Sequence, residues 1–319
     1  MIAKKLMTVA CAAALCGGVW AAEEVKPVPT TTANVEKEVE EEETDDSPLA
    51  GLVAVEANLA FDSRFMTYSV IDGKDPIVRP SGRITFFDWV YFGVEALFDV
   101  TKGNGKRGGY GNRAGRWTIL DSIVGLAHDF DCGETFGALS VDFSYMYESV
   151  PRYRDDEGYK CMKDTQYFDL RLSLNDLWLE PALWIERDIM ADDGTYVNLE
   201  VGHTFPLIDG ERKNGDPVLS FRPSLGQGLG NTQRAAGYFV KYKGSEEPLD
   251  HGGFMDTTVK GELTWNISEH FSLTGYVAYS DYVLDGNMRD GARAHNAAWG
   301  HGCDHSWNLY GGIALGVSF

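Results

Sequence analysis

The sequence predicts an all-β protein, a transmembrane antiparallel up-and-down β-barrel of about 12 strands. Three observations predict this fold class: an alternating C-terminal segment, an N-terminal export signal, and an alternation of long and short connections between the predicted strands. Helices are not expected to span the membrane, because no stretch after the export signal approaches the run of about eighteen apolar residues that a helical span needs.

The C-terminal segment, residues 305–319, gives the clearest strand. Its two rows are Trp307, Leu309, Gly311, Ile313, Leu315 and Val317 on one side, and Asn308, Tyr310, Gly312, Ala314, Gly316 and Ser318 on the other. A period of two is typical of a strand with one apolar face. A free edge of this kind invites aggregation in a soluble protein, whereas a closed barrel has no free edge. The alternative is a buried terminal strand of a soluble β-sandwich.

The last three residues of its apolar row are Leu315, Val317 and the aromatic Phe319. It resembles the terminal signal of bacterial outer-membrane barrels, which end in an aromatic residue. The resemblance implies that the barrel-assembly machinery recognises this strand as an assembly signal and that the protein lies in the cell outer membrane, in contact with its lipids.

Residues 1–21 are typical of a signal peptide. Lys4 and Lys5 precede an apolar segment at 6–16, and the small residues near Ala21 suit cleavage after that position. A lipid anchor at Cys16 is the alternative, but Leu15 stands where a small residue is expected. The signal predicts export from the cytoplasm.

Residues 22–47 are strongly acidic, with ten carboxylates and two lysines, and they contain no aromatic residue. We expect a disordered periplasmic leader, followed by the barrel at 48–319. The whole chain has a net charge of −20. This charge argues against nucleic-acid binding, which needs a basic face.

The remainder divides into strands and turns. The predicted strands cover residues 53–62, 77–87, 89–100, 117–128, 136–147, 165–174, 178–187, 195–205, 218–227, 253–265, 271–282 and 305–319. Pro181 weakens the seventh, because proline lacks a donor for the ladder. The segments 63–76, 228–252 and 283–304 are predicted loops, with 237–242 as an extension of a hairpin. Long connections alternate with short ones, as expected for long outer loops and short periplasmic turns.

Aromatic residues near the predicted strand ends suit two interfacial girdles. They are Phe61, Trp89, Trp117, Tyr147, Trp178, Trp265, Phe271 and Tyr282.

Residues 51–100, with FDSRFMTYSV and DPIVRPSGRITFFDWVYFGVEALFDV, and the later SEHFSLTGYVAYSDY resemble the TorF-type porin family of outer-membrane barrels. The family usually shows an arginine-glycine pair in the first loop, where this chain has Phe65 and Met66. The resemblance implies a barrel and a channel.

Charged residues of inward parity are the pore-lining candidates. Eight are acids and four are bases: Glu56, Arg83, Glu95, Asp142, Asp169, Arg171, Glu180, Glu186, Glu200, Arg222, Lys260 and Glu262. The excess of acid predicts weak preference for cations or for small neutral solutes. The alternative is that these charges pair with one another and fill the lumen, because about twelve strands lies between filled and open barrels.

The predicted loops carry three further features. The segment 101–116 holds five bases and no acid, and is either a constriction at the mouth or a solvated loop. Any disulfide should join Cys161 and Cys303, since Cys132 falls at the other end; free thiols are the alternative. His301, Cys303 and His305 share one face if extended, a weak metal-binding pattern. We therefore expect no metal site and no cofactor.

No motif ties a nucleophile to a base, so we do not expect an enzyme. The predicted function is an outer-membrane, porin-like channel for passive diffusion of small hydrophilic solutes, weakly cation-preferring. The alternatives are a non-conducting structural or adhesive barrel and, third, a lipid-modifying enzyme. Association into homo-oligomers is left open.

Overall fold

The computed structural model describes residues 52–73, 75–101, 117–133, 135–150, 164–208, 217–299 and 303–319. The signal peptide, the acidic leader and the basic segment after Thr101 lie outside these ranges. So do Cys161 and His301, and hence the disulfide and the metal pattern that include them. These remain predictions.

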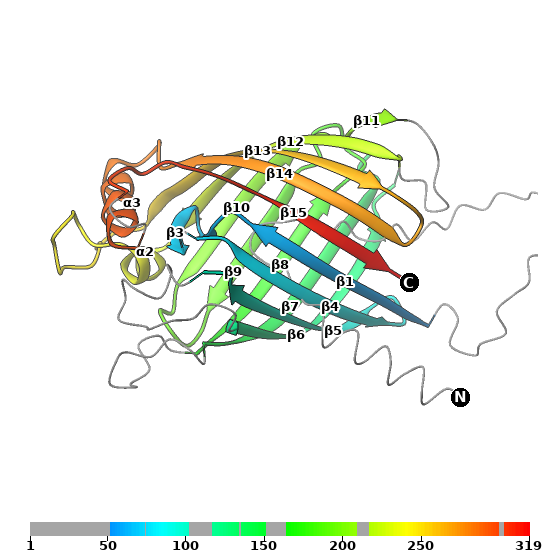
Figure 1. The fold of residues 1–319 in the computed structure, drawn as a ribbon, viewed down its shortest axis with the longest axis horizontal. Coiled ribbons are helices and arrows are strands. Elements are labelled where there is room, and N and C mark those ends of the chain that lie inside the picture. The colour runs from blue at the N-terminus through cyan, green and yellow to red at the C-terminus, as the bar shows by residue number, and fades with distance from the viewer. Residues whose placement is uncertain are drawn as a thin grey trace, which may run out of the picture.

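Twelve antiparallel strands close into one barrel, which confirms the predicted fold class. Each pairs with its neighbours along the chain, and the first pairs with the last, as Figure 1 shows. The strands are β1 (Val53–Asp62), β4 (Ile77–Phe86), β5 (Val90–Asp99), β6 (Trp117–Asp131), β7 (Ala138–Ser149), β8 (Thr165–Leu174), β9 (Ala182–Asp188), β10 (Thr195–Gly202), β12 (Leu219–Gly230), β13 (Gly253–Asn266), β14 (Phe271–Asp281) and β15 (Asn308–Ser318).

The alternation in each strand separates an apolar outer face from a polar inner face. In β1, Leu59 and Phe61 are exposed by 46% and 45%, whereas Ala60 and Asp62 between and beside them are 2% exposed. The same outward row continues around the barrel with Phe92, Val124, Leu126, Phe143, Phe168, Leu199, Leu225, Val259, Leu263, Val277, Leu309 and Ile313. A soluble monomer rarely exposes so large an apolar surface. The outer face is therefore the lipid-facing surface of a transmembrane barrel.

The strand boundaries agree with the predictions to within a few residues, apart from two places. β9 begins at Ala182, directly after Pro181, and not at 178. The predicted strand 195–205 ends at Gly202, and a separate short strand, β11 (Phe205–Ile208), continues the pairing with β12.

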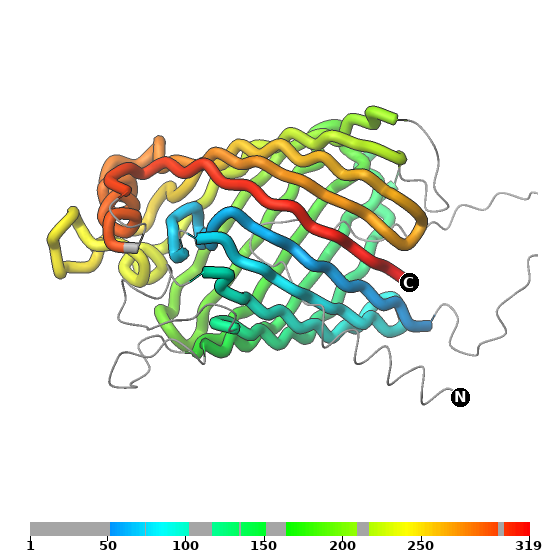
Figure 2. Tube along the Cα trace, in the orientation of Figure 1, coloured from blue at the N-terminus to red at the C-terminus, as the bar shows by residue number. Residues whose placement is uncertain are grey.

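The two ends of the barrel differ, as predicted. One end, here the turn end, carries short links such as 87–89 and 267–270, and Phe319 lies there. The other, the loop end, carries long links such as 231–252 and 282–307. In Figure 2 the C-terminal strand runs beside the first strand and finishes at the turn end.

Three predicted loops contain regular structure at the loop end. Residues 63–76 form the hairpin of β2 (Phe65–Thr67) and β3 (Val70–Gly73). Helix α2 (Thr232–Tyr238) replaces the hairpin extension predicted at 237–242, and helix α3 (Gly286–Trp299) occupies the predicted loop 283–304. We call the hairpin and the two helices the plug. Figure 1 shows α2, α3 and β3 gathered at the loop end.

The plug has its own apolar core, which explains why these segments are ordered. Its buried members come from the hairpin, from both helices and from the adjoining wall: Tyr68, Val70, Tyr196, Ala235, Phe239, Leu249, Met255, Tyr282, Met288 and Ala292. Burial of such side chains contributes roughly 1.5–3 kcal/mol each. The predictions were wrong here because a loop that folds back over the mouth finds apolar partners that alternation within one strand does not reveal.

Polar side chains begin both helices. The Asn231 side chain accepts a hydrogen bond from the Arg234 amide at the start of α2. Asp285 accepts from the amides of Asn287 and Met288 at the start of α3, at 2.9 and 3.2 Å. Among the described residues, neither helix is long and apolar enough to cross a membrane.

Six of the eight predicted girdle aromatics are exposed near the strand ends: Phe61, Trp89, Trp117, Trp178, Trp265 and Phe271. Tyr147 is half-buried. Tyr282 contradicts the prediction because it is fully buried in the plug core, where its hydroxyl donates to the backbone oxygen of Tyr68. Its position at a strand end suits a girdle, but Tyr282 is in step with the buried Ala278 and Ser280 and therefore has inward parity.

Candidate functional site

The structure places all twelve predicted pore-lining residues on the inner face of the barrel. Five are buried, namely Glu95, Asp169, Glu186, Arg222 and Lys260. The other seven are half-buried, namely Glu56, Arg83, Asp142, Arg171, Glu180, Glu200 and Glu262. They fall into groups on different parts of the inner wall, and their role in lining a conducting pore remains a prediction.

One group, near the turn end, is centred on Arg222. Its Nε lies 2.9 Å from Glu180 Oε2, and its Nη1 lies 2.7 Å from Glu200 Oε1. Glu180 also accepts hydrogen bonds from the amide and hydroxyl of Thr204. In the strand beside Arg222, Lys260 Nζ lies 3.5 Å from Glu262 Oε2. This end of the lumen is a bonded network in which each of these bases has an acid.

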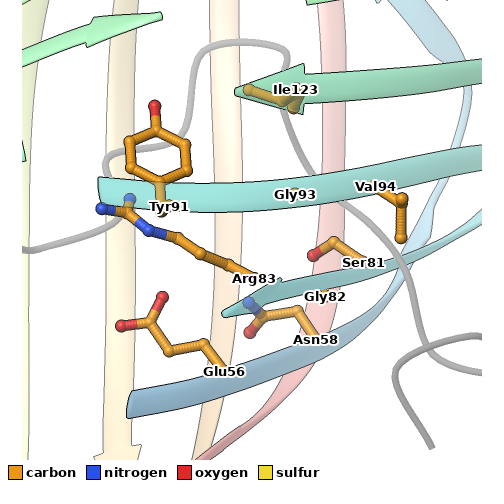
Figure 3. A pocket seen from close by; sticks show the side chains of 9 residues that line it. All are labelled: Glu56, Asn58, Ser81, Gly82, Arg83, Tyr91, Gly93, Val94 and Ile123. Atoms are coloured by element: carbon orange, nitrogen blue, oxygen red, sulfur yellow. The ribbon is translucent and has the colours of Figure 1, made fainter. Parts of the chain in front are cut away.

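A second group borders a small pocket on the inner wall, shown in Figure 3. The Arg83 guanidinium lies 3.6 Å from the centre of the Tyr91 ring, and its Nη1 is 3.5 Å from Asp142 Oδ2. The Tyr91 hydroxyl donates to Asp142 at 2.6 Å. Glu56 and Asn58 point into the same pocket from β1. These groups present both donors and acceptors toward the lumen.

Gly125 allows Tyr91 to take this position. A Cβ on Gly125 would lie 2.3 Å from Tyr91 Cζ, so the ring passes directly over the bare backbone of β6. Glycine in a strand often marks such a close approach.

On the opposite side of β7, the Trp184 indole N–H donates to Asp169 Oδ1 at 3.0 Å. The Arg171 guanidinium lies 5.1 Å from the Trp184 ring centre. Trp184 therefore contacts both charged residues of this part of the lumen, Asp169 through a hydrogen bond and Arg171 through a cation–π contact.

The group at the loop end is organised by Arg234 of α2, which the sequence reasoning missed. Its side chain is 1% exposed, with Nη2 2.9 Å from Glu186 Oε1 and Nη1 3.1 Å from Asp192 Oδ2. The guanidinium lies 4.9 Å from the centre of the Tyr68 ring. The Tyr68 hydroxyl also donates to Glu186. One arginine thus joins the helix, the hairpin and the barrel wall.

Further polar bonds fix the hairpin to the wall. Ser69 donates to Asp256 Oδ2 at 2.7 Å, and Asn308 donates to the Ser69 carbonyl at 2.8 Å. Asn296 of α3 accepts from the Ile71 amide at 2.9 Å, and a ring nitrogen of His295 lies 3.0 Å from Asp72 Oδ1. Burial raises the pKa of the Tyr68 phenol, and the Glu186 carboxylate raises it further. The pKa of Arg234 is raised because its anionic neighbours outweigh the effect of burial.

No family model matches the chain, and no curated protein matches it. Solved structures do resemble it. The COG4313 outer membrane channel from Pseudomonas putida F1 is 10% identical, with 84% of this chain and 96% of the other covered and a TM-score of 0.46. The KdgM porin is 11% identical, with coverages of 83% and 99% and a TM-score of 0.40. OccK5 (OpdH) from Pseudomonas aeruginosa is 9% identical, with coverages of 84% and 98% and a TM-score of 0.36. The fold assignment rests on this chain's own strand pairing.

Several inward charges were absent from the predicted set. Asp62 and Arg79 form a buried ion pair at 2.8 Å, and Arg79 Nη1 lies 3.7 Å from Glu95 Oε1. Asp121 and Glu148 also have inward parity. Parity could have found these four, because Arg79 is in step with Arg83 and Asp62 with Glu56. Arg234 could not be found in this way, because it lies in a segment without strand periodicity.

The C-terminal residues complete the barrel. Phe319 and Val55 exchange two backbone hydrogen bonds of 2.9 Å, and Leu315 is opposite Leu59. Val317 pairs with both Ala57 and Phe271. Recognition of Leu315, Val317 and Phe319 by the assembly machinery remains a prediction.

Proposed function

We propose that the protein is an outer-membrane channel through which small hydrophilic solutes diffuse, with weak preference for cations. The observation that carries this proposal is the contrast between the two faces of one closed barrel, with an apolar outside and an inner wall of charged and hydrogen-bonding side chains. Such an inner wall suits water and polar solutes. Acids outnumber bases in it, which favours cations.

The plug bears on how this channel operates. It packs apolar side chains across the loop end and is fixed by Arg234. We infer that passage through the loop end requires the plug to loosen or to shift. In this proposal the described conformation is the closed state.

The plug also favours a second function, a non-conducting barrel that anchors the leader or presents its loops. The two functions predict different effects of plug release on the conductance of the barrel. A channel whose plug is released should conduct more, whereas a barrel filled by its own ion pairs should stay silent. Outer-membrane lipids and the barrel-assembly machinery are proposed partners in both cases, and homo-oligomers are compatible with both.

Planar lipid bilayers test the channel proposal. Purified protein should give discrete conductance steps, and the reversal potential in a KCl gradient should show weak cation preference. Glu95→Lys and Glu262→Lys should each shift the reversal potential toward anions, whereas Asp290→Lys on the exposed side of α3 should not. Unchanged selectivity in both lumen variants would remove these residues from the pore. Turnover of phospholipid by silent protein would instead support the enzyme alternative.

A further inference from the structure

The small pocket on the inner wall forms where β5 lacks a side chain, at Gly93. Gly93 is in step with the buried, inward residues Tyr91 and Glu95. It is directly opposite Arg83 of β4 and Ile123 of β6. A glycine at an inward position leaves a hollow in the wall, because no side chain fills the space above its backbone. The cavity has a volume of about 20 Å³, which is room for one group of the size of a water molecule.

The side chains around this hollow carry hydrogen-bonding groups that the fold does not use. Within the described part of the chain, the Asn58 amide, the Ser81 hydroxyl and the Glu56 carboxylate make no hydrogen bond to another residue. Ser81 is only 8% exposed, and Asn58 lies directly opposite it. Figure 3 shows the three side chains beside one another on β1 and β4. Buried and half-buried polar groups are normally paired, so these groups are available to a molecule in the lumen.

The charges at the pocket are mixed. Arg83 has Glu56 directly opposite it on β1, and its Nη1 lies 3.5 Å from Asp142 Oδ2. The two carboxylates would repel a small anion, and the guanidinium would repel a small cation. Asn58 and Ser81 add uncharged groups that both donate and accept hydrogen bonds. The pocket therefore suits a neutral solute with many hydroxyl groups better than an ion.

We propose that the pocket binds a neutral polyol, such as a sugar alcohol, as it passes through the barrel. One hydroxyl group fits the hollow above Gly93 and reaches Ser81, while neighbouring hydroxyls bond the Asn58 amide and donate to Glu56. Ile123 gives the carbon chain an apolar contact. The inference rests on the proposed function, because the pocket opens on the inner face of the barrel, and it names the class of solute.

Gly93→Ala fills the hollow without straining the wall. The new Cβ would lie 3.5 Å from the Gly82 carbonyl oxygen and from Ile123 Cβ, which is ordinary van der Waals contact. Replacing glycine by alanine where the space allows it should keep or slightly raise stability. Gly226→Ala on β12 is the matched control. Gly226 also faces inward, and its Cβ would lie 3.5 Å from the Asn198 amide, away from the pocket.

Saturation-transfer NMR of xylitol tests the site without any measurement of conductance. The folded protein is kept in lauryldimethylamine oxide, a detergent without hydroxyl groups. Wild type and Gly226→Ala should bind xylitol equally, whereas Gly93→Ala should lose the signal and melt no lower than the wild type. Asn58→Ala should weaken the affinity by about two- to tenfold, as expected for a lost hydrogen bond. Ribitol should displace xylitol, whereas propionate and propylammonium at the same concentration should not.

Three results would overturn the assignment: no xylitol signal in the wild type, equal signals in Gly93→Ala and Gly226→Ala, or displacement by propionate or propylammonium as effective as that by ribitol. The last result would show that the pocket selects charge and not hydroxyl groups. Silent bilayers with intact xylitol binding would refute the channel and leave the site. Conductance without xylitol binding would refute the site and leave the channel.

Discussion

The Arg234→Met variant should release the plug. The wild-type guanidinium holds Glu186 and Asp192 at 2.9 and 3.1 Å with a side chain that is 1% exposed. Removing one partner of a buried ion pair costs about 3–5 kcal/mol, because it leaves charges uncompensated. Each 1.4 kcal/mol is about a tenfold change, so the population with a released plug should rise by about a hundredfold to a few thousandfold.

Lys241→Met is the matched control, because it lies in the same connection between β12 and β13. Its ion pairs with Glu247 and Asp250 are at the surface, where solvent screens them and such pairs contribute little to stability. Open probability in planar bilayers and the rate of proteolysis within 231–252 should both rise for Arg234→Met and stay near wild type for Lys241→Met. If the two variants match in both measurements, Arg234 does not hold the plug.

Three other outcomes are expected. Gly125→Val should destabilise the protein by about 1–3 kcal/mol and lower its melting temperature, because the new Cβ would clash with the Tyr91 ring. Gly275→Val should cost less, because the nearest atom to its Cβ, the Gly312 carbonyl oxygen, is 4.0 Å away. Equal losses of stability in the two variants would contradict the close contact at Gly125. Phe319→Ala should reduce the fraction of protein recovered in the outer membrane after urea extraction, and full recovery would remove it from the assembly signal. Burial raises the pKa of the phenols of Tyr68, Tyr238 and Tyr282. In a released plug these phenols should ionise near pH 10, whereas in the packed plug they stay neutral, so the stability of the packed plug should fall as the pH rises above about 10. The rate of proteolysis within 231–252 should therefore rise with pH, and Tyr238→Phe should weaken this rise. A rate that stays constant from pH 9 to 11.5 would refute the reasoning.

The barrel could be predicted from the sequence because its physical cause is local. Lipid on one side and polar groups on the other impose a period of two on each strand, and residues such as Leu59, Phe61 and Asp62 display it directly. The ends of strands are harder to predict where a residue cannot join the ladder. Pro181 has no backbone N–H, and β9 begins only after it, at Ala182. Parity also placed the twelve lumen candidates inward.

The plug could not be predicted because its cause is not local. Val70 and Ile71 are fully buried in a short hairpin, and their partners come from helices more than 150 residues later. Helix α3 contains Gly286 and Gly291, which lower helix propensity, so the sequence favoured a loop. The pairing of Arg234 with Glu186 depends on how a loop folds back over the barrel, which no periodicity records.

The seam between β1 and β15 has a consequence for how the molecule forms. Seven registered pairs, from Glu56 with Ser318 to Asp62 with Gly312, join the earliest and the latest barrel strands. Ring closure must therefore await β15, and contacts of such long sequence separation form slowly. A kinetic trace of refolding should end in a slow phase whose rate responds to substitutions along this seam more than to those within any hairpin.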